Sequence, residues 1–295
     1  MKKLNYIPID YRTWELGKNA REGVNIKRLK VLTPKEQELW NQFTTKGELI
    51  RQDLRNDPGQ AEYVTYFAIK LLPYSPGSLR EISIPAAIVH DTGWELKSPT
   101  AWSDLMYGMT AEEQEAQKEE LRRAHQEKGG DNLIEACKAI NYPAQKYRDE
   151  AEAIIRDHDT RYNPATPSGR VMMDADILWR FTMTNILCSK YPRTSDEIKR
   201  NGLWPQTPKY INHQTGNPIK QLLDSPESIL DYMQNEELGK TDKQGKLCRF
   251  FLPESYQIAR IELANTMYDL FPDRTDLLRK DFSKELEQVA EFYSK

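Results

Sequence analysis

The stretch IPAAIVHDTGW (residues 84–94) decides how this chain folds. Its apolar positions recur at i, i+3 and i+4, the spacing of one face of a helix, and Asp91 lies on the same face. Gly93 ends the pattern, because glycine commonly follows the last turn of a helix. The sequence therefore predicts a helix that carries an adjacent His-Asp pair at its C-terminal end.

Helical periodicity continues on both sides of this stretch. Thr33 followed by Pro34 and Glu36 combines an N-cap, a proline at the first helical position and a capping carboxylate, which predicts a helix over 33–54. A further helix starts at Gln60 and stops near Pro73. Downstream, the pattern predicts an exposed acidic helix over 110–120, a separate helix that begins near 125, and helices over 147–158, 171–187, 258–267 and 282–293. No segment alternates with a period of two, so we expect an all-α fold.

Composition divides the chain into three expected parts. A helical extension covers 1–55 and ends at a turn-forming Asn-Asp-Pro-Gly segment. The helical core covers 56–190. The remainder, 191–295, begins as a proline-rich connector and ends in helices that we expect to pack on the core.

The bulk composition is that of an ordinary globular protein. The chain has 295 residues, 38% of them hydrophobic and 29% charged, with a net charge of −3. Lysine and arginine are spread throughout, which argues against nucleic acid bound through a basic surface. We find no signal peptide and no apolar run of membrane-spanning length, so a cytoplasmic protein without a membrane partner is expected. The three cysteines form no CxxC pair, which disfavours a disulfide framework or a zinc ribbon, and the oligomeric state stays open.

Three of the four histidines lie at the ends or on the apolar faces of expected helices. These are His90, His125 and His158, whereas His213 lies in the connector and is interpreted as a surface residue. Carboxylates accompany them at Asp91, Asp159, Asp174 and Asp176. Imidazole and carboxylate together form the ligand set of Fe, Mn, Co, Ni or Zn, and hard carboxylates also admit Mg. Trp94 directly follows the His-Asp turn and could line the same pocket.

Four ordered segments resemble the HD superfamily of metal-dependent phosphohydrolases. They are AAIVHDTGW (86–94), RRAHQEKGG (122–130), AIIRDHD (153–159) and MDADIL (173–178). In turn they resemble that family's helix ending in His-Asp, its histidine at a helix start, its next ligand helix and its closing Asp-Ala-Asp segment. With the helix from Gln60, the resemblance covers 60–178 and implies an HD-domain helical bundle over 56–190.

The resemblance implies one or two divalent transition metal ions (Fe, Mn, Co or Ni, with Mg also admitted). His90 and Asp176 would bind the first ion and His125 and His158 the second, with Asp91 as the bridge. Two neighbouring cations need an anionic bridge, and together they acidify a bound water molecule.

One residue departs from the family pattern. The family begins its first core helix with a histidine, whereas DPGQAEYV (57–64) has Gln60 at that position. A neutral amide oxygen is a poorer ligand than imidazole for transition metals. The first ion is therefore expected to be weakly bound, absent or of a harder class, unless Glu62 supplies the missing ligand.

The function implied by the resemblance is metal-dependent phosphohydrolysis through a metal-activated water. The substrate would be a small phosphorylated molecule, a phosphomonoester or a nucleotide. Asp91 would act at the metals, and Asp159 or Asp174 could carry a proton. Four basic residues near the ligands are candidates for phosphate binding, with surface solvation as the other interpretation of each: Lys97, Arg122, Arg161 and Arg170.

Two other functions stay open at this stage. The same superfamily contains mixed-valent di-iron oxygenases, although Gln60 weighs against a full set of imidazole ligands for two irons. A non-catalytic HD module that binds a nucleotide for regulation is the second alternative. In either case the terminal parts could serve as interaction surfaces or as packing helices of the site.

Overall fold

The computed structural model describes residues 4–10, 31–43, 60–96, 110–159, 164–183, 185–186, 225–233, 238, 250–274, 276–277, 279 and 282–294. These residues contain helices and no strand, so the predicted all-α class is confirmed. The α-helices are α2 (Pro34–Phe43), α3 (Gln60–Leu71), α4 (Arg80–Val89), α6 (Ala111–Ile140), α7 (Gln145–Asp157), α8 (Pro167–Leu178), α12 (Pro226–Tyr232), α13 (Pro253–Leu270) and α15 (Ser283–Tyr293). Within this part of the chain, no helix combines the length and the apolar character needed to cross a membrane.

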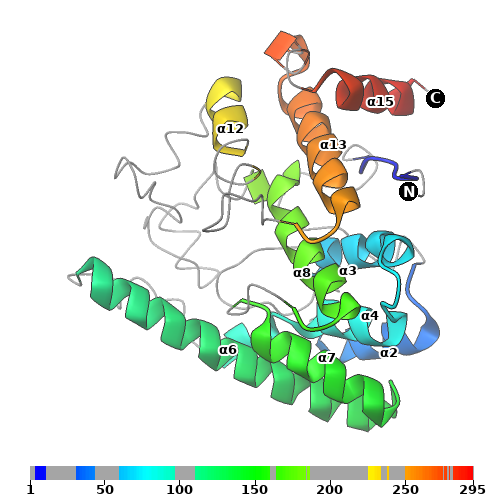
Figure 1. The fold of residues 1–295 in the computed structure, drawn as a ribbon, viewed down its shortest axis with the longest axis vertical. Coiled ribbons are helices and arrows are strands. Elements are labelled where there is room, and N and C mark those ends of the chain that lie inside the picture. Colours follow the sequence, from blue (N-terminus) through cyan, green and yellow to red (C-terminus); the bar gives the residue numbers. More distant parts are fainter. Residues whose placement is uncertain are drawn as a thin grey trace.

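Helix α4 lies at the centre of the core. It packs against α2, α3, α6, α7 and α8 (Figure 1). All its residues from Ile82 to Val89 are buried. A helix that is apolar on every side is stable only when other elements surround it. The His-Asp pair that follows α4 is consequently buried in the interior of the molecule.

Helices α6 and α7 form a long antiparallel pair along one side of the core (Figure 1). Thr110 begins α6 with a capping box to Glu113, and Asn141 ends it with a φ of 50°. The sequence-based expectation of an exposed helix over 110–120 and a separate helix beginning near His125 was wrong, because one continuous helix covers both. His125, which was expected near a helix start, and the glycines Gly129 and Gly130 all lie inside it. Tertiary packing outweighs the cost of about 1 kcal/mol that each glycine imposes on a helix interior.

Several other helix limits agree with the sequence. Helix α2 begins after the predicted cap, with the Glu36 amide donating to Thr33 Oγ1 (3.3 Å) and the Thr33 amide donating to Glu36 Oε2 (2.7 Å). Helix α3 begins at Gln60, as predicted. Helix α8 differs from the predicted helix over 171–187. It starts earlier, because Thr166 caps it and Pro167 occupies its first turn, and it ends at Leu178. The predicted end of the first helix at 54 and the connector over 190–220 lie outside the described residues.

The C-terminal helices bring the two ends of the chain together. Helix α13 contacts α8 and α15. Residues 4–10 lie against α13, where the buried Glu262 carboxylate accepts hydrogen bonds from Tyr6 Oη (2.5 Å) and from the Ile9 amide (3.0 Å). The N- and C-terminal ends therefore lie near each other (Figure 1).

A buried ion pair attaches α2 to α4. Arg80 donates from Nε to Glu36 Oε1 and from Nη2 to Glu36 Oε2, both at 2.7 Å. The Glu36 side chain is fully buried and the Arg80 side chain is partly exposed. The hydrogen bonds that Arg80 donates to Glu36 raise the pKa of the guanidinium above its usual value, although burial lowers it. Removing one partner would leave the other charge buried without compensation.

We expect Glu36→Ala to lower the free energy of unfolding by roughly 1–3 kcal/mol, because it leaves the partly exposed Arg80 guanidinium without its carboxylate and removes a helix cap. The matched control is Glu119→Ala, whose carboxylate pairs with Arg123 on the exposed surface of α6 and should cost less than about 1 kcal/mol. Denaturant unfolding of both variants measures the difference. Equal losses would contradict the structural role given to the buried pair.

Candidate metal centre

The three predicted ligand histidines are oriented by the same kind of contact with the backbone. In each, Nδ1 faces the carbonyl oxygen of a residue three or four positions earlier: Ala87 for His90 (2.9 Å), Leu121 for His125 (3.3 Å) and Ile155 for His158 (2.7 Å). A carbonyl accepts a proton from Nδ1, so this nitrogen carries the hydrogen of the neutral ring. The lone pair is then on Nε2, the form that binds metal ions.

The helix periodicity explains why these rings are buried. His125 belongs to a buried stripe on α6 that includes Leu121, Gly129 and Leu133, spaced four residues apart. His158 follows α7 one turn after the buried Ile154 and Ile155. Each histidine therefore continues the apolar face of its helix and points toward α4.

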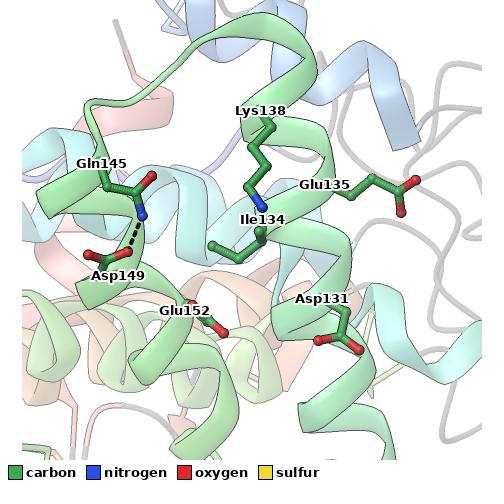
Figure 2. A pocket seen from close by; sticks show the side chains of 7 residues that line it. All are labelled: Asp131, Ile134, Glu135, Lys138, Gln145, Asp149 and Glu152. Carbon is green, nitrogen blue, oxygen red and sulfur yellow. Dashed lines mark hydrogen bonds between the residues drawn. The ribbon is translucent and has the colours of Figure 1, made fainter.

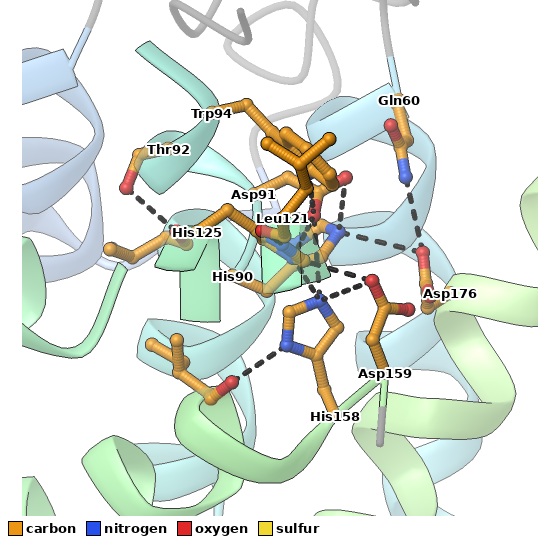
Figure 3. A network of polar contacts seen from close by, with 12 residues as sticks. Gln60, His90, Asp91, Thr92, Trp94, Leu121, His125, His158, Asp159 and Asp176 are labelled. Carbon is orange, nitrogen blue, oxygen red and sulfur yellow. Dashed lines mark hydrogen bonds and ion pairs between the residues drawn. The ribbon is translucent and has the colours of Figure 1, made fainter. Parts of the chain in front are cut away.

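Three donor atoms form a nearly equilateral triangle at the centre of the site (Figure 3). Asp91 Oδ1 lies 3.5 Å from His125 Nε2 and 3.4 Å from His158 Nε2, and the two nitrogens are 3.4 Å apart. Ligand atoms around a tetrahedral ion with bonds of about 2.1 Å are separated by about 3.4 Å. All three residues are buried, and together they could hold a metal ion.

The electrostatics of the cluster call for a positive charge. Two Nε2 lone pairs 3.4 Å apart repel each other unless a proton or a cation lies between them. Burial lowers the pKa of His158, but the charges of Asp159, Asp91 and Asp176 outweigh it and raise the pKa to about 9. A bound cation would satisfy the same demand and displace the proton, so metal affinity should increase with pH. The donor set therefore fits the metal ion that the sequence predicts.

The other predicted ligands lie on the opposite side of Asp91. His90 Nε2 is 3.6 Å from Asp91 Oδ2 and 3.5 Å from Asp176 Oδ1, too far for good hydrogen bonds. This buried nitrogen has no hydrogen-bond partner within the described part of the chain. Burial lowers the pKa of His90, but the charges of Asp91 and Asp176 outweigh it and raise the pKa. The pKa of Asp176 is raised by burial and lowered more strongly by its contact with His90.

Gln60 occupies the position expected from the sequence. Its amide nitrogen donates to Asp176 Oδ1 at 3.2 Å, and the residue is only 7% exposed (Figure 3). Glu62, the proposed substitute, is buried on α3 but is not one of the residues grouped around Asp91. At the predicted first metal site, the side-chain amide of Gln60 therefore presents its NH2 group, a hydrogen-bond donor, to Asp176.

Asp159 joins the cluster at its more exposed edge. Its Oδ2 lies 3.3 Å from His125 Nε2 and 3.9 Å from His158 Nε2, and its side chain is 30% exposed. Among the carboxylates that contact the buried imidazoles, Asp159 is therefore the most exposed to solvent.

Asp174 does not face the cluster. Positions two residues apart on a helix point about 200° apart, so Asp174 and Asp176 face opposite sides of α8. The Asp174 carboxylate accepts hydrogen bonds at the start of α13, from the amides of Phe251 and Leu252 (2.8 Å each) and from Ser255 Oγ (2.6 Å). Burial raises its pKa to about 7 although these hydrogen bonds lower it. The structure therefore places Asp174 against the segment that leads into α13, and its proton-carrying role stays a prediction.

The structure gives limited support to the predicted phosphate contacts. Arg122 is partly exposed on α6 and lies near Glu119, with 3.7 Å between Nη1 and Oε2. Arg170 is exposed on α8, four residues before Asp174 and so nearer to that side of the helix than to Asp176. Lys97 and Arg161 lie outside the described residues. Phosphate binding by these four residues stays a prediction.

Two features support the ligands: the sequence predicted that Trp94 could line the pocket, and it did not predict a role for Asn132. The Trp94 ring stacks on the His125 ring, with centroids 3.9 Å apart and planes inclined by 13°, and Trp94 Nε1 donates to Asp91 Oδ1 at 3.1 Å. Asn132 Nδ2 donates to Thr92 Oγ1 at 3.2 Å, which holds the turn after Asp91 against α6. The signal for Asn132 was a polar residue within the apolar stripe of α6. Such contacts around the ligands typically change metal affinity by about 10- to 100-fold.

A shallow groove between α6 and α7 is separate from this cluster in composition. Its lining is mostly acidic and exposed, and Gln145 donates to Asp149 across one turn of α7 (2.5 Å; Figure 2). None of its lining residues belongs to the histidine cluster.

Comparison with family models, curated proteins and solved structures gave no match for the chain.

The turn at Gly93 sets the distance between Asp91 and α6. A Cβ atom at this position would lie 1.9 Å from the His125 carbonyl oxygen and 2.7 Å from the Gly129 nitrogen. Both neighbours are backbone atoms and cannot rotate away. At Gly130, by contrast, an added Cβ would meet the guanidinium of Arg156 at 2.8 Å, a flexible group.

We expect Gly93→Ala to push the turn away from α6 and to lower the affinity for Co²⁺ by on the order of 100-fold, because Asp91 and His125 separate. Gly130→Ala should bind Co²⁺ within a few-fold of the original protein. Equilibrium dialysis on folded samples measures both affinities. Unchanged binding by Gly93→Ala would show that this contact does not position the ligands.

Proposed function

We propose that the protein is a metal-dependent phosphohydrolase that acts on a phosphomonoester or a nucleotide-type substrate. The observation that carries the proposal is the triangle of Asp91 Oδ1, His125 Nε2 and His158 Nε2, with edges of 3.4–3.5 Å. The donor set suits a divalent transition metal (Fe, Mn, Co or Ni) and, at its carboxylates, Mg. The resemblance of the four sequence segments to HD phosphohydrolases supports the same reaction class.

Bound divalent ions would supply an acidified water molecule and neutralise charge on the phosphate oxygens. His125, His158 and Asp91 would hold one ion; His90, Asp176 and Gln60 face a second position. The carbonyl contacts to Nδ1 keep the rings from turning, and Trp94 keeps the Asp91 carboxylate in place. Ligands on rigid helices are held more accurately than ligands on loops.

Asp159 is the residue we assign to proton transfer. Its carboxylate contacts His125 Nε2 at 3.3 Å and its side chain is 30% exposed. A carboxylate at the edge of a buried cluster can accept a proton from an attacking water molecule and release it to solvent. We prefer Asp159 to Asp174 for this role because the oxygens of Asp174 accept three hydrogen bonds at the start of α13.

We expect the purified protein to release phosphate from phosphomonoesters or nucleotides in the presence of Mn²⁺, Co²⁺, Ni²⁺ or Mg²⁺. Asp91→Ala should lower the rate by on the order of 1,000-fold, because metal ions contribute several kcal/mol of charge stabilisation. Asp149→Ala, which removes an exposed carboxylate on α7, should leave the rate unchanged. Phosphate release under anaerobic conditions provides the measurement.

Two results would contradict this function. Two bound irons and a product that forms only with oxygen would indicate an oxygenase. Tight nucleotide binding without turnover under every metal would indicate a regulatory binding module.

A further inference from the structure

The two oxygens of Asp91 face unequal sets of ligands. Oδ1 faces two imidazole nitrogens, those of His125 and His158, whereas Oδ2 faces one, that of His90. We propose that the cluster binds two cations of different class: a tightly held, four-coordinate transition metal on the Oδ1 side, and a weaker, harder ion such as Mn²⁺ or Mg²⁺ on the Oδ2 side. The inequality concerns the ions themselves and is independent of the reaction that they support.

The Oδ1 side is arranged for a transition metal before any ion arrives. Edges of 3.4–3.5 Å match tetrahedral coordination, whereas an octahedral Mg²⁺ site with bonds of about 2.1 Å needs neighbouring ligands about 3.0 Å apart. Two imidazoles also favour Zn, Co or Ni over Mg. Trp94 contacts both His125 and Asp91, so the side chains of these two ligands are already held in position and little of their conformational entropy remains to be lost when an ion binds.

The Oδ2 side is set up differently, and Gln60 is the reason. Its amide nitrogen donates to Asp176 Oδ1, so the group directed at the site is a donor and not a ligand oxygen. To bind a cation, the amide must turn over and give up its hydrogen bond to a charged carboxylate, a loss that corresponds to roughly 10- to 100-fold in affinity. The resulting set is one imidazole, two carboxylates and one amide oxygen, which suits hard ions.

The unpartnered nitrogen of His90 indicates that the Oδ2 side does take an ion. His90 Nε2 is buried and without a hydrogen-bond partner in the described part of the chain. It is directed between two carboxylates at 3.5 and 3.6 Å, the arrangement that a cation between them would satisfy. The Asp176 side chain is 23% exposed, which gives water access to the same position. Hard ions such as Mg²⁺ retain water ligands when they bind proteins.

Equilibrium dialysis of the metal-free protein with Co²⁺ tests the inequality. The original protein should bind one Co²⁺ with the intense visible absorption of a four-coordinate ion, and a second at least 10-fold more weakly. Excess Mg²⁺ should displace only the second ion. Gln60→His should tighten the second Co²⁺ by 10-fold or more, because it replaces the amide with imidazole. Gln145→His, the same substitution at an exposed glutamine of α7, should behave as the original protein does.

Two equally tight ions in the original protein would overturn the inference. So would an unchanged second affinity in Gln60→His, with folding verified by circular dichroism. If that variant does not fold, Gln60→Glu, which keeps the size and adds a charged oxygen, should tighten Mn²⁺ on the Oδ2 side; unchanged Mn²⁺ binding overturns the inference. A protein that binds both ions as expected and hydrolyses no phosphate ester contradicts the proposed function alone.

Discussion

The site depends on a contact between two stretches of backbone. The turn after α4 approaches α6 so closely that a Cβ at Gly93 would meet the His125 carbonyl oxygen at 1.9 Å, and a Cβ at Gly129 would meet the His90 carbonyl oxygen at 3.0 Å. Two residues without side chains are therefore needed where α4 ends against α6. This approach brings Asp91 Oδ1 to 3.5 Å from His125 Nε2, and α7, packed on both α4 and α6, adds His158. Helix packing thus fixes the triangle of donor atoms.

The same arrangement has a cost in folding free energy. Carboxylates and imidazoles that converge in a buried position are expensive unless their charges are compensated. The carboxylates of the cluster oppose the effect of burial and raise the pKa values of His90 and His158, because they favour the charged imidazole. Folding free energy from the apolar core around α4 offsets this cost. Residues that violate local stability rules in an otherwise consistent fold commonly mark a functional site.

The sequence predicted the parts of this structure that depend on periodicity. Apolar stripes with a spacing of three or four residues gave the helices and showed that His158 lies on an apolar face. Periodicity did not reveal that α6 is continuous through Gly129, because the glycine is accommodated by its contact with the end of α4. Periodicity also did not identify the side chains and amides that Asp174 and Asp176 contact. The partners of Asp174 begin 77 residues later in the chain, and the amide that contacts Asp176 lies 116 residues earlier. Such contacts are set by tertiary packing and leave no local pattern.

The most direct test of the account is anomalous X-ray scattering from crystals of the protein soaked with Co²⁺. We predict that the strongest peak lies about 2.0–2.2 Å from His125 Nε2, His158 Nε2 and an Asp91 oxygen. Cobalt at the acidic groove between α6 and α7, with none at this triangle, would contradict the assignment of these three residues as a metal site.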